Sequence, residues 1–389
     1  MTETIQEPRP LAPPAEKLSR RALARIAAVA GVAGLLPAAA AAKTSADATR
    51  VFDPTRLGRV HTLPSTPQTI RSGVLDPAAK PVLTIRSGDV VHYPDTWLHW
   101  GNKPKYGMSF EEREPIRKQY REGPFSLIGP VAVEGAEPGD TIECRMLRLR
   151  PIDWGWNSAP LGVGAIPEDF DKPYLKYFRF DADRRHAEFA PGIRLPLAPF
   201  QGVMATQPNG EAPVSAILTG DYGGNILMPE LGEGTSLFLP VQQAGGNLWT
   251  GDSNAVQGDG VVNQTAIETA MEDLRIQYVL HKGVRAPGPL GETPTHWAVL
   301  GYGDSLDDAM VMAVRRMVTR LSEALGMDKG DAYSITSLAG SFRASQFARQ
   351  SHTNYVVKPA KAVQGLLPKA IFSADHAARI SNAIRTGGV

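Results

Sequence analysis

The chain has 389 residues, a formal net charge of +1 and 21% charged residues. That length suits one large domain or two smaller ones, and the even use of both charges excludes an extended basic surface for nucleic acids. The 38 glycines and 32 prolines favour a turn-rich, mainly β protein over a helical one. Cys144 is the single cysteine, which excludes an intrachain disulfide framework and a cysteine-based structural zinc site.

Residues 1–42 have the pattern of a twin-arginine export signal. Arg20 and Arg21 precede an apolar run from Ile26 to Leu36, and an alanine-rich cleavage site ends at Ala42. The alternative is an alanine-rich helix of the mature protein. Because the apolar run is too short for a retained membrane helix, we expect a periplasmic protein with no membrane span once the signal is removed.

Residues 43–80 are rich in Pro, Thr, Ser and Asp, which predicts an extended N-terminal arm with a candidate strand at Val60–Thr62. The next stretch, Pro81–Tyr93, alternates apolar and polar residues on both sides of a Ser-Gly-Asp turn, a pattern that predicts a β-hairpin. Asp95 and His99 follow it. His99 lies between two tryptophans in the sequence, so a packed or surface histidine is one interpretation of it.

A turn and a strand are predicted at residues 137–149. Glu137 to Asp140 read Glu-Pro-Gly-Asp, which fits a type II turn. The apolar residues of the following strand change faces, which predicts a bulge near Met146. Cys144 lies on this strand. It is either a core residue or a nucleophile, and we interpret it as core because no histidine lies near it in the sequence.

The stretch Thr219–Glu268 is the most informative part of the chain. Short apolar runs alternate there with glycine-rich turns, which allow sharp bends and the close approach of a ligand. Side chains with oxygen atoms lie between the glycines: Asp221, Asn225, Glu230, Asp252, Asn254, Gln257, Asp259 and Glu268. The pattern predicts loops that bring oxygen ligands or an acid/base pair together.

The last third of the chain combines a strand and helices. Leu274–Leu280 alternates with period two and predicts a strand, with a helix over Thr265–Leu274 as the alternative. Ser305 and Asp308 resemble a capping box, and Met310, Ala313, Met317, Leu321 and Leu325 recur at helical spacing before Gly326. Further helices are predicted from Asp328 and over Ala374–Arg385.

Several motifs are similar to those of the acetamidase/formamidase family of amide hydrolases. They are GGN at 223–225, EGTSLFLPV at 233–241, GD-x-x-A-x-QGDG at 251–260 with TAIE at 265–268, and GP-x-x-VEGAEPGD at 129–140. The resemblance extends over about residues 80–370. It implies a β-sandwich or jelly-roll fold, which with the element pattern predicts a mainly β domain over residues 81–285 and a C-terminal α+β lobe over residues 286–389.

The resemblance also implies a function. Family members hydrolyse small linear amides such as formamide or acetamide at a metal-linked site, where a divalent ion activates water and a carboxylate moves the proton. We therefore expect a small-molecule amide as substrate and a homo-oligomer as the assembled form. The alternative is a non-catalytic or ligand-binding descendant with a degraded metal site.

The site residues follow from the matched motifs. The predicted metal ligands are Asp252, Asn254, Asn225 and Asp95, and the predicted catalytic carboxylates are Glu268, Asp259 and Glu134. Asp95 and His99 occupy the region where the family has acidic residues. Three positions depart from the family pattern: Leu227 and Val261 replace acids, and Asn254 replaces a histidine. Since Asn ligates calcium and zinc favours His and Cys, a calcium-like or vacant site is at least as well supported as a zinc site.

Overall fold

The computed structural model describes residues 50–347, 349–350 and 355–387. The predicted export signal, residues 1–42, lies outside the described residues. Among the residues described, no helix is both long and apolar enough to cross a membrane.

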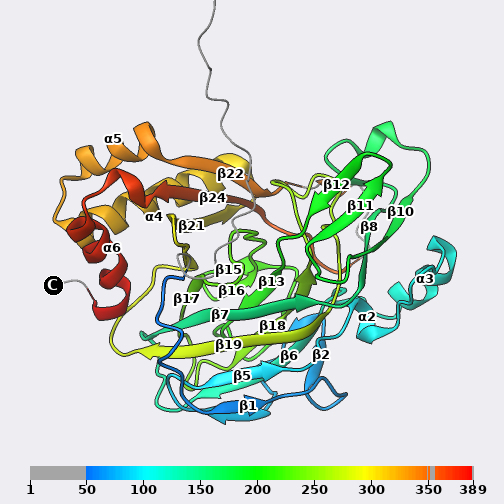
Figure 1. The fold of residues 1–389 in the computed structure, drawn as a ribbon, viewed down its shortest axis with the longest axis horizontal. Coiled ribbons are helices and arrows are strands. Elements are labelled where there is room, and N and C mark those ends of the chain that lie inside the picture. Colours follow the sequence, from blue (N-terminus) through cyan, green and yellow to red (C-terminus); the bar gives the residue numbers. More distant parts are fainter. Residues whose placement is uncertain (1–49, 348, 351–354, 388–389) are drawn as a thin grey trace, which may run out of the picture. The chain divides into compact units, whose positions relative to one another are not determined.

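The chain is mostly β and is built on two large sheets (Figure 1). The first has nine strands, in the order β1 (Val60–Thr62), β5 (Val90–Tyr93), β19 (Met271–His281), β7 (Thr141–Pro151), β17 (Ser236–Pro240), β20 (Leu290–Glu292), β21 (His296–Gly303), β24 (Lys361–Pro368) and β22 (Ser341–Gln346). The second has the order β15 (Thr219–Gly220), β16 (Gly223–Asn225), β13 (Phe200–Ala205), β18 (Leu248–Asn254), β6 (Ser126–Val133) and β2 (Ile70–Ser72), with β4 (Leu83–Ile85) also paired to β6.

Short strand pairs and helices complete the fold. The pairs are β8 (Trp154–Ala159) with β10 (Tyr174–Arg179), β11 (His186–Ala190) with β12 (Ile193–Pro196), β3 (Val74–Leu75) with β14 (Val214–Ser215), and β9 (Val163–Gly164) with β23 (Arg349–Gln350). The α-helices are α2 (His99–Asn102), α3 (Phe110–Arg117), α4 (Leu306–Leu325), α5 (Lys329–Ala339) and α6 (Ala374–Thr386), and short 3₁₀ turns lie at Pro167–Asp169 and Lys369–Ile371.

The main core lies between the two large sheets. Ile142 of β7 and Ile276 of β19 come from the nine-stranded sheet, whereas Val131 of β6 and Met204 of β13 come from the other, and all four belong to one buried apolar cluster. Two sheets that share a core in this way form a sandwich, so the predicted mainly β fold is confirmed. Cys144 is fully buried in the same cluster, as predicted for a core residue.

Two local predictions on the nine-stranded sheet are confirmed. The period-two segment forms β19, which excludes the alternative helix at its start. The register between β7 and β19 shifts where Arg275 and Ile276 face Arg148 and Met146, which is the predicted bulge. The strand predicted at Val60–Thr62 is β1, and it pairs in parallel with β5.

The predicted hairpin at residues 81–93 is wrong. Both strands and the turn exist, but β4 pairs with β6 in one sheet and β5 pairs with β19 and β1 in the other. The turn at residues 86–89 therefore carries the chain from one sheet to the other. Ile85 and Val91 point into the core from opposite sides, which satisfies the same alternating pattern that a hairpin would.

The C-terminal helices form where they were predicted. The side chain of Ser305 accepts a hydrogen bond from the backbone N–H of Asp308 at the start of α4, and Gly326 ends that helix at φ +68°. Ala313, Met317 and Leu321 of the predicted stripe are buried, whereas Met310 is exposed and Ala309 is buried in its place. The helix packs on β21 and β24 in a second apolar core that includes Trp297, which α6 also joins.

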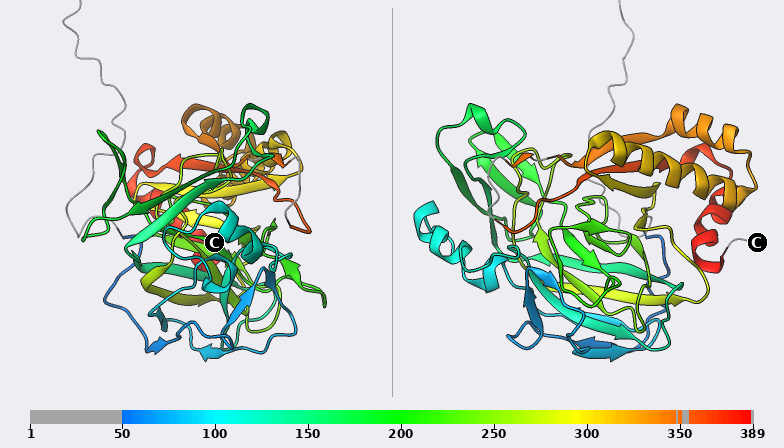
Figure 2. Two further views of the ribbon diagram at one scale, coloured as in Figure 1. Left: turned by 90° about the vertical axis from the view of Figure 1, so that its right-hand side faces the viewer. Right: turned by 180° about the vertical axis from the view of Figure 1, so that it is seen from behind.

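The predicted boundary at residue 286 does not separate two sheets. Strands β20, β21, β24 and β22 come after it and continue the nine-stranded sheet directly from β17. The physical reason is that β20 pairs with β17, so the edge of the N-terminal half of the sheet is covered by the C-terminal strands. In Figures 1 and 2, helices α4, α5 and α6 lie together at one end of the described part of the chain, and α3 lies at the opposite end.

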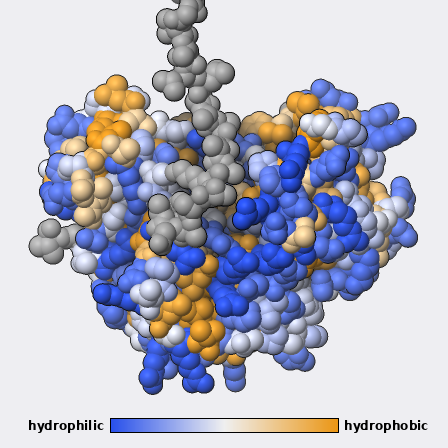
Figure 3. All heavy atoms as spheres, in the orientation of Figure 1, coloured by the Kyte–Doolittle hydropathy of each residue, from blue (hydrophilic) through white to orange (hydrophobic). Residues whose placement is uncertain are grey.

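The outer surface is mainly hydrophilic on the face drawn in Figure 3, with apolar side chains in separate patches. Helices α4 and α5 carry four exposed apolar side chains: Met310, Val311, Tyr333 and Leu338. Leu338 is the most exposed of the four. The homo-oligomer stays a prediction.

Candidate active site

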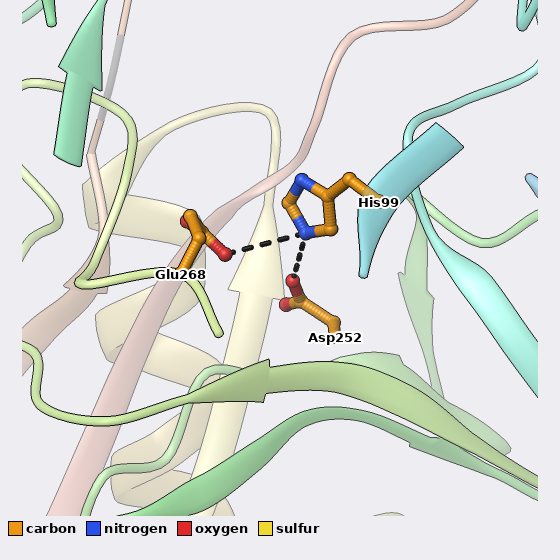
Figure 4. Close-up of side chains that lie close together, drawn as sticks. All are labelled: His99, Asp252 and Glu268. Atoms are coloured by element: carbon orange, nitrogen blue, oxygen red, sulfur yellow. Dashed lines mark hydrogen bonds and ion pairs between the residues drawn. The ribbon is translucent and has the colours of Figure 1, made fainter. Parts of the chain in front are cut away.

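Three ionisable side chains from distant parts of the chain meet in one place (Figure 4). His99 comes from α2, Asp252 from β18, and Glu268 from the segment just before β19. Nε2 of His99 lies 2.9 Å from Oδ1 of Asp252 and 3.3 Å from Oε2 of Glu268. All three residues are buried, so water does not screen their interactions as it does at the surface.

Asp252 owes its position to an unusual backbone and to the residue facing it. It has φ +56° within β18, a conformation that costs most residues free energy but that Asp tolerates better than most. On the neighbouring strand β13, Gly202 lies against it. A Cβ on Gly202 would fall 2.1 Å from Oδ2 of Asp252 and 2.7 Å from Nδ2 of Asn254. Glycine at this position therefore leaves the space that the carboxylate occupies.

Hydrogen bonds to the backbone hold the other two residues, Glu268 and His99, in place. Glu268 exchanges backbone hydrogen bonds with Trp156, at 2.8 and 3.0 Å, and its Oε1 accepts a bond from the N–H of Ala266. His99 lies at the start of a tight turn in which Trp100 and Gly101 have positive φ. Ser126 anchors this turn, because its hydroxyl donates to the carbonyl of Leu98 and accepts from the N–H of Gly101.

Burial and neighbouring charges set the protonation of the cluster. Burial opposes a charge on His99, but the carboxylates of Glu268 and Asp252 outweigh it and raise the pKa of His99 to about 9. Burial raises the pKa of Glu268, Asp252 adds to that effect, and His99 opposes it. Glu268 is therefore a carboxyl that accepts a proton more readily than an ordinary glutamate.

The cluster lies in a cavity of about 120 Å³. Aromatic rings make much of its wall: Trp100, Phe125 and Trp156 each lie within 6.0 Å of the His99 ring, centroid to centroid, in edge-to-face arrangements. Polar groups also line it. Gln257 is one of these, and neither atom of its buried side-chain amide has a hydrogen-bond partner among the described residues.

Four of the predicted site residues gather here. Asp252 and Glu268 are in the cluster itself. Asn254 is next to Asp252, with its Nδ2 2.9 Å from the Asp252 carbonyl oxygen. Asn225 lines the same cavity, and its Nδ2 donates to the carbonyl of Ile217. The side-chain oxygens of both asparagines are buried without a hydrogen-bond partner in the described part of the chain.

The other three predicted residues lie elsewhere. Asp259 is close to Gln364 and Arg343, with its side chain nearly half exposed. Glu134 is exposed on the turn after β6 and pairs with Arg86. Asp95 accepts a hydrogen bond from the backbone of Ser65 and borders a different hollow. None of the three is among the residues that line the cavity.

The positions that depart from the family pattern are also at the site. Leu227 and Val261 line the cavity and pack with Phe200 in a small apolar cluster. Both have positive φ, 43° and 46°, which is unusual for such side chains and above all for a β-branched valine. The backbone keeps sharp turns at these places while the side chains make one wall apolar.

His99 is the functional residue that the sequence indicated least. Its place after β5, in the region where the family has acids, was the only signal for it. Asn254 cannot act as a base or bind a metal through nitrogen as a histidine does. His99, 155 residues earlier in the chain, supplies an imidazole to the same cluster.

The cluster fits a divalent metal ion. One imidazole nitrogen and two carboxylate oxygens lie within 4.8 Å of one another. Oε2 of Glu268 is buried and accepts no hydrogen bond among the described residues beyond its ion pair with Nε2 of His99 at 3.3 Å, so it has a lone pair to offer a cation. A set of one His and two carboxylates suits zinc and related ions better than calcium, which prefers oxygen ligands.

Known proteins resemble this chain in sequence and in fold. Residues 111–219 match the model of the Acetamidase/Formamidase family. An acetamidase from Bacillus halodurans of known structure superposes with a TM-score of 0.71 and 27% identity, over 80% of this chain and 98% of that one. An acetamidase from Yersinia enterocolitica shares the fold, with a TM-score of 0.71 and 24% identity over 81% and 93% of the two chains. The family model, the relatives and the solved structures together support the assignment of this chain to the acetamidase/formamidase family.

Curated relatives of the family match over shorter stretches. A formamidase of Methylophilus methylotrophus is 24% identical over 252 residues, which is 47% of this chain and 60% of that protein. A protein of Schizosaccharomyces pombe is 25% identical over 192 residues, 35% of this chain and 47% of its own length. The matched stretches thus span about half the length of these relatives.

Proposed function

We propose that this protein is a hydrolase that cleaves the C–N bond of a small linear amide. The single observation that carries the proposal is the group of His99, Asp252 and Glu268, buried together at an aromatic-walled cavity. Buried ionisable groups that face a cavity are costly for stability and are typical of active sites. The family assignment of the chain supports amide hydrolysis over other reactions of such a site.

We propose further that His99, Asp252 and Glu268 would hold a zinc-type divalent ion. Such an ion supplies Lewis-acid polarisation of the amide carbonyl and lowers the pKa of water. Asn225 and Asn254 offer unpaired oxygens close by that would orient water or substrate. The chain's own groups do the rest of the chemistry.

Glu268 is the proposed proton carrier. Its carboxylate would take the proton of the attacking water and return it to the departing nitrogen. Gln257 is the proposed partner of the amide group, since its unpaired side-chain oxygen and nitrogen complement the N–H and carbonyl of an amide substrate. The apolar wall formed by Leu227 and Val261, which pack on Phe200, would limit access of bulk water.

Ammonia release from formamide and acetamide tests the proposal. Glu268→Gln keeps the size of the side chain but removes its proton exchange, so kcat should fall by roughly 10²- to 10⁴-fold. Asp252→Asn should lower both the bound zinc, measured on the purified protein by elemental analysis, and kcat/KM. Asp259→Asn is the matched control, because that carboxylate lies outside the cavity, and it should behave as the wild type.

Two results would contradict the proposal. If Asp259→Asn abolishes activity while Glu268→Gln does not, the active centre is elsewhere. If the wild type releases no ammonia from a panel of small amides and Asp252→Asn alters only ligand binding, the chain is a binding protein and not an amidase.

We also propose that residues 1–42 direct export by the twin-arginine route. The supporting observation is the Arg20-Arg21 pair before a short apolar run and an alanine-rich cleavage site. Replacing both arginines by lysine should retain the full-length chain in the cytoplasm, as judged by fractionation and immunoblotting. Cleavage and periplasmic recovery of that double variant at wild-type levels would exclude this route.

A further inference from the structure

Arg113 is a buried cation that the proposed mechanism does not use. It lies in α3, whose first turn is fixed by a capping box between Ser109 and Glu112. Arg113 is 4% exposed, and its guanidinium lies between two indole rings, with Cζ 5.0 Å from the Trp100 centroid and 4.5 Å from the Trp156 centroid. Two such stacking contacts hold a planar guanidinium in a defined orientation.

The terminal nitrogens of this guanidinium have no carboxylate partner in the described part of the chain, and the Tyr177 hydroxyl is their polar neighbour. Nη1 and Nη2 are both buried, and neither has a hydrogen-bond partner among the described residues. The two neighbouring carboxylates pair with other residues. Glu114 forms a bidentate pair with Arg117, and Oε2 of Glu268 faces His99. Burial lowers the pKa of Arg113, with Tyr177 and Glu268 opposing that effect. A buried guanidinium without a counter-ion is costly, so the site suits an anion that arrives from outside.

Arg113 and the ionisable cluster face the same cavity. The ring of Trp156 contacts both groups, because its centroid lies 5.6 Å from the His99 centroid and 4.5 Å from Cζ of Arg113. One small molecule can therefore touch both. An end-on pair of N–H donors matches the two oxygens of a carboxylate.

Formamide and acetamide carry no anionic group, so either of them bound in this cavity would leave the buried guanidinium of Arg113 without a counter-charge.

We propose that the substrate is a small amide that also carries a carboxylate, such as the monoamide of a four-carbon dicarboxylic acid, with Arg113 as the carboxylate-binding residue. This inference rests on the proposed function. In the reaction, the oxygen of water forms a bond to the amide carbon, the C–N bond breaks, and the proton passes to the nitrogen. The succinamate anion and water thus give the succinate dianion and ammonium, with no oxidant or other reactant.

Two amides of the same size test the role of the charge. Succinamate and 4-methylpentanamide have the same number of heavy atoms and a similar branched end, but only succinamate is an anion. The wild type should favour succinamate in kcat/KM by roughly 10- to 100-fold, the range expected of a charge-assisted bidentate contact. In Arg113→Met this ratio should fall to about one or below.

Two further variants make the test specific. Arg113→Lys keeps the charge but not the paired donors, so it should retain an intermediate ratio. Arg117→Met is the matched control: it removes another arginine of α3 that lines the cavity, but one already neutralised by Glu114. The ratio should stay at the wild-type value in this variant. Thermal unfolding and near-UV circular dichroism would show that each variant is folded.

A binding measurement separates this inference from the proposed hydrolysis. Titration calorimetry with succinate should give a Kd that is at least tenfold higher in Arg113→Met than in the wild type. If ammonia is released but the wild-type ratio is near one or is unchanged in Arg113→Met, the carboxylate site is wrong and the hydrolase stands. If neither amide is hydrolysed but succinate binding still depends on Arg113, the hydrolase is wrong and the carboxylate site stands.

Discussion

At the scale of single residues, the position of Asp252 depends on the absence of a side chain at residue 202. Gly202 has no Cβ, and the space next to its Cα is filled by Oδ2 of Asp252. In Gly202→Ala the new methyl group would force the carboxylate away from His99, because a side-chain end yields more easily than a strand backbone. We expect kcat/KM to fall by roughly 100-fold, with a much smaller loss of thermal stability.

Gly258→Ala is the control for this substitution. A Cβ on Gly258 would have no neighbour within 4 Å, and the residue belongs to the same glycine-rich motif. It should keep wild-type kinetics. Equal losses of activity in the two variants would mean that the motif needs flexible glycines and not the space at residue 202.

The same scale shows which parts of the site the sequence could reveal. Asn225, Asp252, Asn254 and Glu268 lie in the motifs that resemble the family, so the resemblance was enough to group them. Strands β16 and β18 both pair with β13, and Glu268 bridges Asn254. Asp259 belongs to the same motif, but the turn at 258–261 directs its side chain toward Arg343 and away from the cavity. His99 joins the group through contacts across about 150 residues, and no local pattern records such a contact.

At the scale of elements, the packing of α4 on β21 also depends on one glycine. A Cβ on Gly301 would lie 2.0 Å from the carbonyl oxygen of Ala309 and 2.5 Å from the backbone nitrogen of Ala313. Both are backbone atoms of a helix, so they can give way only if the whole helix moves. Gly301→Ala should lower the free energy of unfolding by about 3 kcal/mol, measured by urea denaturation, whereas a loss below about 0.5 kcal/mol would show that α4 is not seated rigidly.

Elements whose signals are local were predictable, and their pairing was not. Helix α4 was found from Ser305, Gly326 and its apolar spacing, because caps and periodicity act within a few residues. The sequence also predicts strands β4 and β5, but it wrongly predicts that they pair with each other in a hairpin. Their alternation states only that one face is buried, and in a sandwich either sheet can bury it.

At the scale of the whole chain, a buried network of charges ties the C-terminal helix to the nine-stranded sheet. Glu143 of β7 is fully buried and contacts Arg385 of α6 at 2.8 Å, Arg145 at 2.9 Å and His281 at 3.0 Å. Arg385 also contacts Glu292 of β20 at 2.8 Å. Residues from strands that are not neighbours in sequence, and from the last helix, thus share one set of hydrogen bonds.

This network predicts how stability depends on pH. Burial opposes the charge of Glu143, but His281 and Arg385 outweigh it and hold its pKa below the ordinary value of 4.5. The pKa of Glu292 is also lowered, since Arg385 and Lys369 outweigh its burial. A carboxylate with a depressed pKa stabilises the fold fully above its unfolded pKa and loses that effect as pH falls through the folded value. The free energy of unfolding should therefore decline steadily below pH 4.5.

Arg385→Met tests the origin of that decline. The variant leaves Glu143 and Glu292 with fewer cations, so we expect a loss of about 3 kcal/mol at pH 7 and a shallower further decline in acid. Arg194→Met is the control, because Arg194 is mostly exposed and pairs only loosely with Asp181, and it should change stability by at most about 0.5 kcal/mol. If Arg385→Met keeps the wild-type slope between pH 3 and 5, the acid sensitivity comes from other carboxylates, and α6 is held by its apolar contacts through Ile380 and Ile384.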